Sequence, residues 1–421
     1  MRLAEESILS DQLLRQLISV GEVDVLIGLP THNNAETVGQ VVQVIRAGLL
    51  KYFPRERTAI LNADGGSHDG TQDLVQAASI SDARNSHTLQ ALRTMHCFSS
   101  RYPGEPSTGT ALRTILAAAD LLRARACAVI SPESNVAPEW MEVLVRPAYQ
   151  QDFDFIAPVY CRHKFEGLLV TNLLYPMTRA LYGCPIREPY AADFGFSGRL
   201  AAHFLTEDSW QQDVSGRGAE LSLTLAAIAG GFRLQQTFLG PKGTAERQPA
   251  DLVLAMRQTV GTLFASLGRY FSNWSAITED QAVVTIGADN QVATHPMRVN
   301  RKRLLQMFRN GVGELEPILS SILSHGTLEE LKHFASVQEE EFQYADELWV
   351  KTVYEFAASY QHAVISRNHI IQALVPLFRG RAYSFLLRNR ETSGVEVEQQ
   401  IENLCQAFER LKPYLLELWK K

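Results

Sequence analysis

The sequence predicts an α/β fold, a mostly parallel sheet flanked by helices, followed by an α-helical C-terminal domain. Two strand–turn–helix units occupy residues 23–80, and such alternation is typical of parallel sheets. From Asp251 onward, apolar residues recur with helical spacing instead. At 421 residues the chain exceeds one ordinary hydrophobic core. We predict an N-terminal helix over 1–22, an α/β domain over 23–250 and a helical domain over 251–421.

Composition excludes several classes of protein. The formal net charge of −6 offers no basic face for a nucleic-acid partner. No apolar run approaches the ~20 residues that span a bilayer, and the N-terminal residues do not form a signal peptide. Five scattered cysteines lack metal-site or redox spacing, so we expect a reduced, cytoplasmic chain. Whether it forms a homodimer stays open.

The first strand end lies at Pro30 and Thr31. An apolar strand from Val23 reaches Pro30, a polar elbow follows, and a helix is expected to open near Ala35 with Glu36 in its first turn. Polar residues directly after a parallel strand lie at the edge of the sheet where ligands bind. This turn is therefore the first half of a predicted ligand site.

The second strand end is Asp64-Gly65-Gly66-Ser67, which follows the apolar run from Thr58 to Leu61 and precedes a helix over Gln72–Ala78. The glycines allow close backbone approach, and Asp64 offers an acceptor for a donor on a ligand. A plain turn without a ligand explains Asp-Gly-Gly equally well. The similar strand end upstream favours the ligand site.

Together, Leu29-Pro30-Thr31 with Asn33, Asn34 and Glu36, followed by Asn62 to Ser67, resemble the nucleotide-binding half of a GT-A glycosyltransferase. Within that group the chain is similar to the mannosylglycerate, glucosylglycerate and glucosyl-3-phosphoglycerate synthases. The resemblance implies transfer of a hexose from a nucleotide sugar to a small carboxylate acceptor that carries a hydroxyl, with retention of anomeric configuration. It places Pro30, Thr31, Glu36, Asp64, Gly66 and Ser67 around the donor.

Residues 81–106 are polar and contain prolines and Gly104, so we expect a loop. Gly109 then opens an alanine-rich helix, whose free N–H groups suit a phosphate. The related enzymes carry a lysine where this chain has Thr108, which removes one positive charge near the donor.

A metal site is implied next. The strand Cys127–Ile130 ends in Ser131-Pro-Glu133, where the related enzymes carry Asp-x-Asp and hold a divalent cation. Carboxylate ligands suit Mg²⁺ or Mn²⁺. The relatives also place a metal-binding His near Thr244 and Glu246. We therefore expect Glu133 and Glu246 as the metal ligands.

The acceptor residues are also inferred from the resemblance. Arg162, with Lys164 nearby, stands where the family binds the acceptor carboxylate, and an arginine fork fits that group. Asp193 and Glu220 occupy acidic positions near the reacting sugar, so we expect them to be catalytic. The alternatives are solvated charges at 162 and 164, and a glutamate that only faces its helix dipole at 220.

The last part of the chain favours helices. Periodic segments run over Leu252–Phe271, Arg303–Phe308, Leu328–Phe334, Leu348–Tyr360 and Ile401–Leu418, with an irregular link over Asn273–Thr294. Arg379 and Arg381 either reach the acceptor or are surface charges.

Two other functions stay open. The altered lysine, Asp-x-Asp and His positions all weaken the metal–diphosphate site, so a GT-A-shaped binding or regulatory protein is the alternative. A dinucleotide-dependent dehydrogenase is disfavoured because the first turn lacks Gly-x-Gly-x-x-Gly.

Overall fold

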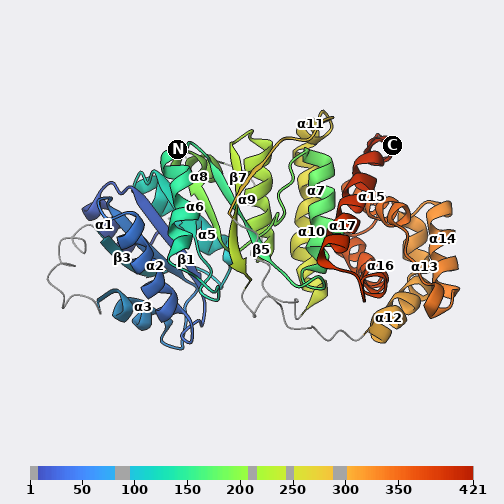
Figure 1. Cartoon of the computed structure of the whole chain (residues 1–421), viewed down its shortest axis with the longest axis horizontal. Coiled ribbons are helices and arrows are strands. Elements are labelled where there is room, and N and C mark those ends of the chain that lie inside the picture. The colour runs from blue at the N-terminus through green and yellow to red at the C-terminus, as the bar shows by residue number, and fades with distance from the viewer. Residues whose placement is uncertain (1–7, 81–94, 207–215, 243–250, 288–300, 421) are drawn as a thin grey trace. The chain divides into compact units, whose positions relative to one another are not determined.

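A computed structural model describes residues 8–80, 95–206, 216–242, 251–287 and 301–420 (Figure 1). The chain divides into two compact units. The first comprises 1–161, 190–246 and 283–291, and the second comprises 162–189, 247–282 and 292–421. This division differs from the predicted domains, because 162–189 groups with the helical unit and 283–291 with the α/β unit.

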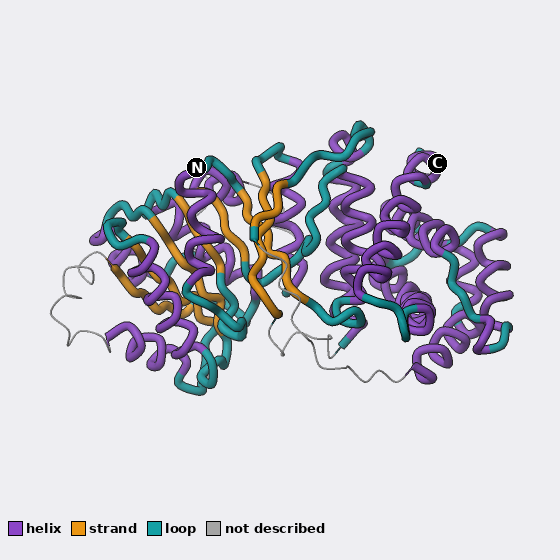
Figure 2. The backbone as a smooth tube through the Cα atoms, viewed as in Figure 1, coloured by secondary structure: helices purple, strands orange, loops and turns teal. Residues whose placement is uncertain are grey.

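The first unit is built on one sheet with the strand order β3-β2-β1-β4-β6-β5-β7-β8. Strand β6 is antiparallel to both β4 and β5, and the other pairs are parallel. Figure 2 shows the strands of this unit in orange and the helices in purple. This mostly parallel sheet, flanked by helices, confirms the predicted α/β class. The strands are β1 Val25–Thr31, β2 Thr58–Asp64, β3 Met95–Arg101, β4 Ala126–Val129, β5 Phe155–Cys161, β6 Phe194–Ser197, β7 Leu234–Pro241 and β8 Val284–Ile286.

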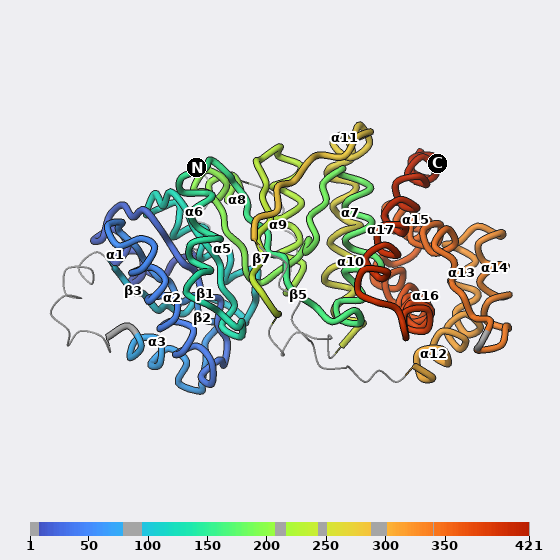
Figure 3. Tube along the Cα trace, viewed as in Figure 1, coloured from blue at the N-terminus to red at the C-terminus, as the bar shows by residue number. Residues whose placement is uncertain are grey.

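Helices cover both faces of this sheet. Helices α2, α3 and α6 pack on one face, and α5, α8 and α9 group together on the other, with α1 beside α5. Figure 3 follows the chain through this α/β unit in the blue-to-green part of its trace. The helices are α1 Asp11–Val20, α2 Val38–Tyr52, α3 Thr71–Ile80, α5 Thr108–Leu121, α6 Glu139–Gln150, α8 Gly198–Thr206 and α9 Arg217–Ala229.

Alternation along β1 explains how both faces are filled. Val25, Ile27 and Leu29 point into the core that contains α2 and α6. Gly28 points the other way, where a Cβ atom would lie 2.5 Å from Cγ2 of Ile115 in α5. The missing side chain therefore lets α5 pack closely against the strand.

Strand register then brings the predicted turns to one edge. Thr31 pairs with Asp64 across β1 and β2, and Gly28 pairs with Val129 across β1 and β4. The carboxyl ends of these three parallel strands consequently lie together, as expected for a ligand edge.

Two predicted loops contain strands. β3 lies within 81–106 and β8 lies within the link 273–294. Each is an edge strand, and the side chains of β8 are all exposed while most of β3 is half-buried. Edge strands need no continuous apolar pattern, which is why the sequence indicated loops there. Residues 81–94 and 288–300 lie outside the described residues.

Helix α2 begins at Val38, later than the expected start near Ala35. The N–H groups of Thr37 and Val38 both donate to the carbonyl of Asn34, which closes a turn first. Helix α3 covers the predicted 72–78. Of the predicted helix over 1–22, the structure has α1 over Asp11–Val20, and residues 1–7 lie outside the described residues.

The second unit is helical, as predicted, and α16 packs against α10, α12 and α15. The predicted segment Ile401–Leu418 is two helices, with Pro413 in the first turn of the second. Among the described residues, no helix combines the length and apolar character needed to cross a membrane. The main helices are η1 Val170–Leu174, α7 Tyr175–Tyr182, α10 Leu252–Arg269, α11 Phe271–Trp274, α12 Arg301–Glu314, α13 Glu316–Ile322, α14 His325–Ser336, α15 Asp346–His362, α16 Arg367–Arg388, α17 Gly394–Arg410 and α18 Lys412–Trp419.

A cluster of buried polar residues connects the π-helix η1 to α15 and α16 of this unit. The Asn172 carbonyl accepts from Nε1 of Trp349 at 2.7 Å, and its Oδ1 accepts from Nε of Arg381 at 3.0 Å. Arg381 also donates to the Tyr344 carbonyl at 2.9 Å and pairs with Asp346 at 2.6 Å. Arg381 is therefore a buried structural cation rather than a surface charge. The widened helical turn places the Asn172 carbonyl where Trp349 can donate to it.

Replacing Asn172 with Ala should lower the free energy of unfolding of the helical unit by about 1–3 kcal/mol, because the buried Arg381 loses an acceptor. Urea denaturation followed by tryptophan fluorescence measures this change. Asn403→Ala, on the exposed face of α17, is the matched control and should shift the transition by no more than about 0.5 kcal/mol. Equal stability of the two variants would contradict a structural role for Asn172.

Candidate functional site

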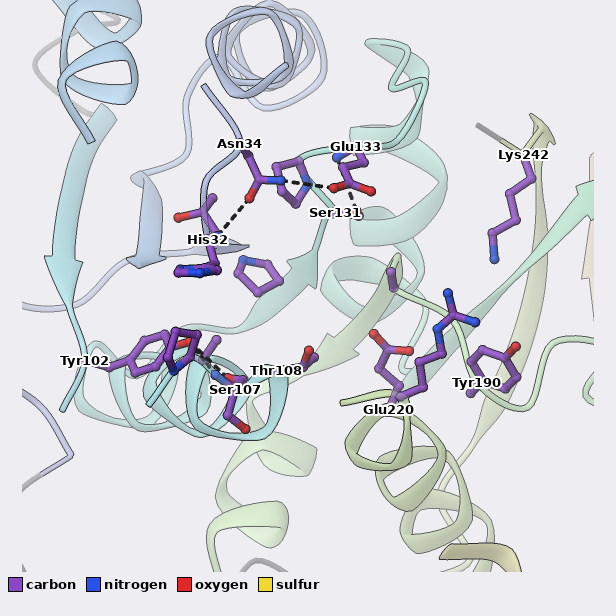
Figure 4. Close-up of a pocket in the computed structure, with 17 residues that line it drawn as sticks. His32, Asn34, Tyr102, Ser107, Thr108, Ser131, Glu133, Tyr190, Glu220 and Lys242 are labelled. Atoms are coloured by element: carbon purple, nitrogen blue, oxygen red, sulfur yellow. Dashed lines mark hydrogen bonds between the residues drawn. The ribbon is translucent and has the colours of Figure 1, made fainter. Parts of the chain in front are cut away.

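A pocket of about 340 Å³ opens at the carboxyl ends of β1 and β4, within the first unit (Figure 4). Its walls come from the turn after β1, the N-terminal ends of α5 and α9, the loop after β4 and the end of β7. The lining residues are Pro30, Thr31, His32, Asn34, Tyr102, Pro106, Ser107, Thr108, Ala111, Ser131, Pro132, Glu133, Tyr190, Ala192, Arg217, Glu220 and Lys242.

The turn after β1 forms one wall. Pro30 and Thr31 line the pocket as predicted, and the Nδ2 of Asn34 donates to Oε1 of Glu133 at 3.2 Å. This bond connects the β1 turn to the loop after β4. Glu36 is exposed on the turn and does not line the pocket, because the helix begins three residues later than the expected start near Ala35.

Asp64 lies directly behind this wall and is fully buried. Its carboxylate accepts from Oγ1 of Thr31 at 2.9 Å, from Nε2 of Gln72 at 2.7 Å, and from the N–H and hydroxyl of Ser67 at 2.8 and 2.6 Å. The N–H of Gly66 donates to it at 2.9 Å. Burial alone would raise the pKa of Asp64, but the bonds from Ser67, Gln72 and Thr31 hold it below its ordinary value.

Asp64, Gly66 and Ser67 therefore bind one another rather than line the pocket. Gly66 adopts a φ of +84°, and a Cβ there would lie 2.7 Å from Nε of Arg101. The carboxylate holds the turn between β2 and α3 in place. Direct contact of these three residues with a nucleotide stays a prediction.

Asp193 plays a similar part beneath the loop after β4. It accepts from the Ser131 N–H at 2.8 Å, from the Ser134 hydroxyl at 2.7 Å and from the Tyr160 hydroxyl at 2.6 Å. It is buried and does not line the pocket. Its carboxylate positions the loop that carries Glu133, so a direct catalytic role stays a prediction.

Of the two predicted metal ligands, only Glu133 lies among the described residues. Glu133 lines the pocket and is exposed, while the Ser131 hydroxyl accepts from its backbone N–H at 3.3 Å. Over the described ranges, no group of three His, Cys, Asp or Glu side chains is arranged to hold an ion. Thr244 and Glu246 lie outside the described residues. Glu133 could supply one carboxylate to a divalent cation beside phosphate oxygens, and binding of such an ion stays a prediction.

The opposite wall carries the second carboxylate. Glu220 lies in the first turn of α9, is largely shielded from solvent and faces the pocket (Figure 4). A carboxylate in this position can orient a hydroxyl group or accept its proton. Glu220 thus lies in the pocket wall, and its catalytic role stays a prediction.

Two cations line the same pocket and were not predicted from the sequence. Lys242 follows β7, with its Nζ 5.0 Å from the centre of the Tyr160 ring. Arg217 begins α9, with its Cζ 6.0 Å from the Tyr190 ring. Both lie close in sequence to predicted site residues, Lys242 two residues before Thr244 and Arg217 three before Glu220, but neither was itself predicted. His32 was also missed, although it stands between Thr31 and Asn33 in the first predicted turn.

The N-terminal end of α5 completes the site. Ser107 and Thr108 line the pocket, and the Tyr102 hydroxyl accepts from the Ser107 N–H at 2.9 Å. Gly109 is buried inside the first turn and is not among the lining residues. The free N–H groups of this helix end favour a negatively charged ligand group.

The two predicted acceptor residues belong to the helical unit. Arg162 donates from Nε and Nη2 to the Glu188 carboxylate at 2.7 and 2.6 Å. Lys164 donates to the carbonyls of Arg390 and Thr392 at 3.2 and 2.8 Å. Both therefore have partners within their own unit, and binding of an acceptor by them stays a prediction.

Comparison with known proteins finds similarity only at the level of structure. No family model and no curated protein matches the chain. It is similar to glucosyl-3-phosphoglycerate synthase from Mycobacterium tuberculosis in complex with Mn²⁺, uridine diphosphate and glucosyl-3-phosphoglycerate, with a TM-score of 0.43 and 16% identity over 64% of this chain and 87% of that one. It is also similar to mannosyl-3-phosphoglycerate synthase from Rubrobacter xylanophilus, with a TM-score of 0.42 and 20% identity over 63% and 80%. Similarity this distant says nothing about activity.

Replacing Asp64 with Asn should lower the free energy of unfolding at pH 7 by about 1–3 kcal/mol, because a carboxamide cannot accept from all five donors. The lowered pKa means that the carboxylate stabilises the fold above its unfolded pKa of about 4. That contribution disappears as the pH falls through the lower pKa of the folded state.

Urea denaturation between pH 7 and pH 3 tests this, and the difference between wild type and Asp64→Asn should narrow at the acid end. Asp73→Asn, on the exposed side of α3, is the control and should follow the wild type at every pH. A difference that stays constant with pH would refute the stabilising role of the charged carboxylate.

Proposed function

We propose that this protein is a hexosyltransferase that uses a nucleotide sugar and a small hydroxy acid of the glycerate type. The observation that carries the proposal is the pocket itself, where the shielded Glu220 faces a helix N-terminus across the ligand edge of a mostly parallel sheet. Its volume of about 340 Å³ falls within the ~300–1,000 Å³ usual for small-molecule sites.

The donor would bind along the β1 turn, with its phosphates near the end of α5. Pro30 and Thr31 supply the rigid end of β1, and the N–H groups that open α5 suit phosphate oxygens. The buried Asp64 keeps both neighbouring strand ends in register without needing to touch the ligand. In this proposal the nucleotide lies against the backbone of the β1 turn and the first turn of α5, and Asp64 supports that backbone from behind.

The reaction would take place near Glu220. Transfer forms a bond between the anomeric carbon and the acceptor oxygen, and it breaks the bond from that carbon to the donor phosphate. Glu220 would orient the acceptor hydroxyl or accept its proton. Retention of configuration and binding of the acceptor carboxylate by Arg162 are parts of the proposal that come from the sequence resemblance.

A binding or regulatory protein of the same fold is the second candidate. It is favoured by one observation, that the described residues around Glu133 do not assemble a metal-ligand group. Such a protein would bind a nucleotide in the pocket without transferring a sugar.

Incubation with UDP-, GDP- and ADP-hexoses plus D-glycerate or 3-phosphoglycerate should give a glycosylated acid, detected by mass spectrometry with its anomeric configuration read by NMR. Glu220→Gln should lower turnover by about 10²–10⁴-fold, because a carboxamide cannot accept a proton. Glu142→Gln, on exposed α6 surface, is the control and should keep wild-type turnover. Nucleotide binding without transfer from any donor would favour the binding protein instead.

A further inference from the structure

We infer that Asn33 holds the ring of His32 in one tautomer, with the proton on Nδ1, and that this N–H group binds the nucleoside of the donor. The inference rests on the proposed function, since it assumes that a nucleotide occupies the pocket. It assigns recognition of the nucleoside to a side chain of the β1 turn.

His32 stands at the carboxyl end of β1, where it is exposed and lines the pocket. Its backbone N–H donates to Oδ1 of Asn34 at 2.8 Å, which fixes this part of the turn. Figure 4 shows His32 on the side of the pocket where Tyr102 lies, away from Glu220. A donor whose sugar reacts near Glu220 would therefore have its nucleoside on the side of His32.

The amide group of Asn33 has a defined orientation. Its Oδ1 accepts from the backbone N–H of His68 at 3.0 Å, and a backbone N–H can only donate. The amide atom that faces His32 is therefore Nδ2, which lies 3.2 Å from Nε2 of the imidazole ring. The Ser67 hydroxyl accepts from the backbone N–H of Asn33 at 2.9 Å and helps to hold this residue at its φ of +55°.

This orientation selects the tautomer of His32. An amide nitrogen only donates, so Nε2 of the ring has to accept from it. A proton on Nε2 would point at the N–H group of Asn33, which disfavours both the Nε2–H tautomer and the doubly protonated ring. The hydrogen bond made by one ring nitrogen determines which nitrogen carries the proton, and here that is Nδ1.

The Nδ1 atom faces a corner of the pocket formed by Gly65, Tyr102 and Pro106. A Cβ atom on Gly65 would lie 3.3 Å from Nδ1 of His32. The same point lies 2.7 Å from Oη of Tyr102 and 3.2 Å from Cβ of Pro106, and both of these residues line the pocket. Within the ranges that the structure describes, Nδ1 makes no hydrogen bond, so its N–H group can bind a ligand.

The neighbouring polar side chains already have partners. The Thr31 hydroxyl is bonded to the buried Asp64. Asn34 accepts the N–H of His32 through Oδ1 and donates to Glu133 through Nδ2. The Nδ1–H group is therefore the side-chain donor of this turn that is oriented toward a ligand.

The N-terminal end of α5 separates the phosphates from this corner. The Tyr102 hydroxyl accepts from the Ser107 N–H at 2.9 Å, so a phosphate would bind the N–H groups that follow, from Thr108 onward. The part of the donor that reaches His32 is then the nucleoside, whose base and ribose carry uncharged acceptor atoms.

Long-range ¹H–¹⁵N NMR of the full chain, labelled at histidine, tests the tautomer. The signals of His32 are those that disappear in His32→Phe. Near pH 7 we expect a protonated Nδ1 and an unprotonated Nε2 in the wild type. In Asn33→Asp, Nε2 should become protonated, because a carboxylate can only accept. An Nε2–H tautomer in the wild type would overturn the inference.

Isothermal titration calorimetry with UDP, GDP, ADP and inorganic pyrophosphate tests the contact. His32→Phe, which lacks the donor, should weaken binding of the tightest nucleoside diphosphate about fivefold to tenfold, equivalent to about 1–1.4 kcal/mol at 25 °C. The affinity for pyrophosphate should not change. His32→Asn, whose amide supplies a donor, should restore most of the loss.

His68→Ala is the matched control. The His68 side chain is exposed and does not line the pocket, and the variant keeps the backbone N–H that donates to Asn33. It should bind every probe like the wild type. Equal binding by His32→Phe and the wild type, an equal loss for pyrophosphate, or no binding of any of the three nucleoside diphosphates would each overturn the inference.

The sugar-transfer assay keeps this result distinct from the proposed function. Transfer with a donor KM that is unchanged in His32→Phe would uphold the transferase and overturn the inference. Binding of a nucleoside diphosphate that depends on His32, without transfer from any donor, would uphold the inference and refute the transferase.

Discussion

The arrangement of the candidate site depends on one buried carboxylate, that of Asp64. It receives five hydrogen bonds from the end of β1, from its own turn and from the first turn of α3. Removing a charge from water is costly unless donors replace the solvent, and here they do. These hydrogen bonds fix the turns after β1 and β2 relative to each other at the edge of the sheet where the pocket opens.

Asp193 is likewise a buried carboxylate that accepts several hydrogen bonds, and it lies under the loop after β4. In both places an acidic residue that follows or precedes a strand is satisfied by backbone N–H groups and hydroxyls rather than by a ligand. Sequence alone does not distinguish these outcomes, because the same short acids suit a ligand and a local turn. The carboxylates expected to contact the substrate therefore shape the pocket, and Glu133 and Glu220 form its acidic surface.

The sequence predicts a strand correctly where the strand is buried, because a buried strand is a continuous apolar run. The central strands β1, β2 and β4 are apolar runs that are followed by Pro, Gly or short polar residues. The sequence therefore predicts where each of these strands ends. Edge strands β3 and β8 keep polar or exposed residues and lack that pattern. The division of the chain was harder still, because 162–189 joins the helical unit through contacts between residues far apart in sequence, such as Asn172 with Trp349.

The same reasoning explains which pocket residues escaped prediction. Pro30, Thr31 and Glu133 stand in strand-end motifs, whereas Lys242 and Arg217 are far apart in sequence and line one pocket only because β7 and α9 reach the same edge. A sequence motif contains residues that are close together in the chain. The electrostatic potential in a cavity depends on all the charged side chains around it, including those far apart in sequence. The altered residues of the implied metal motif therefore do not by themselves indicate an inactive site, because a motif does not include every charged side chain that lines the cavity.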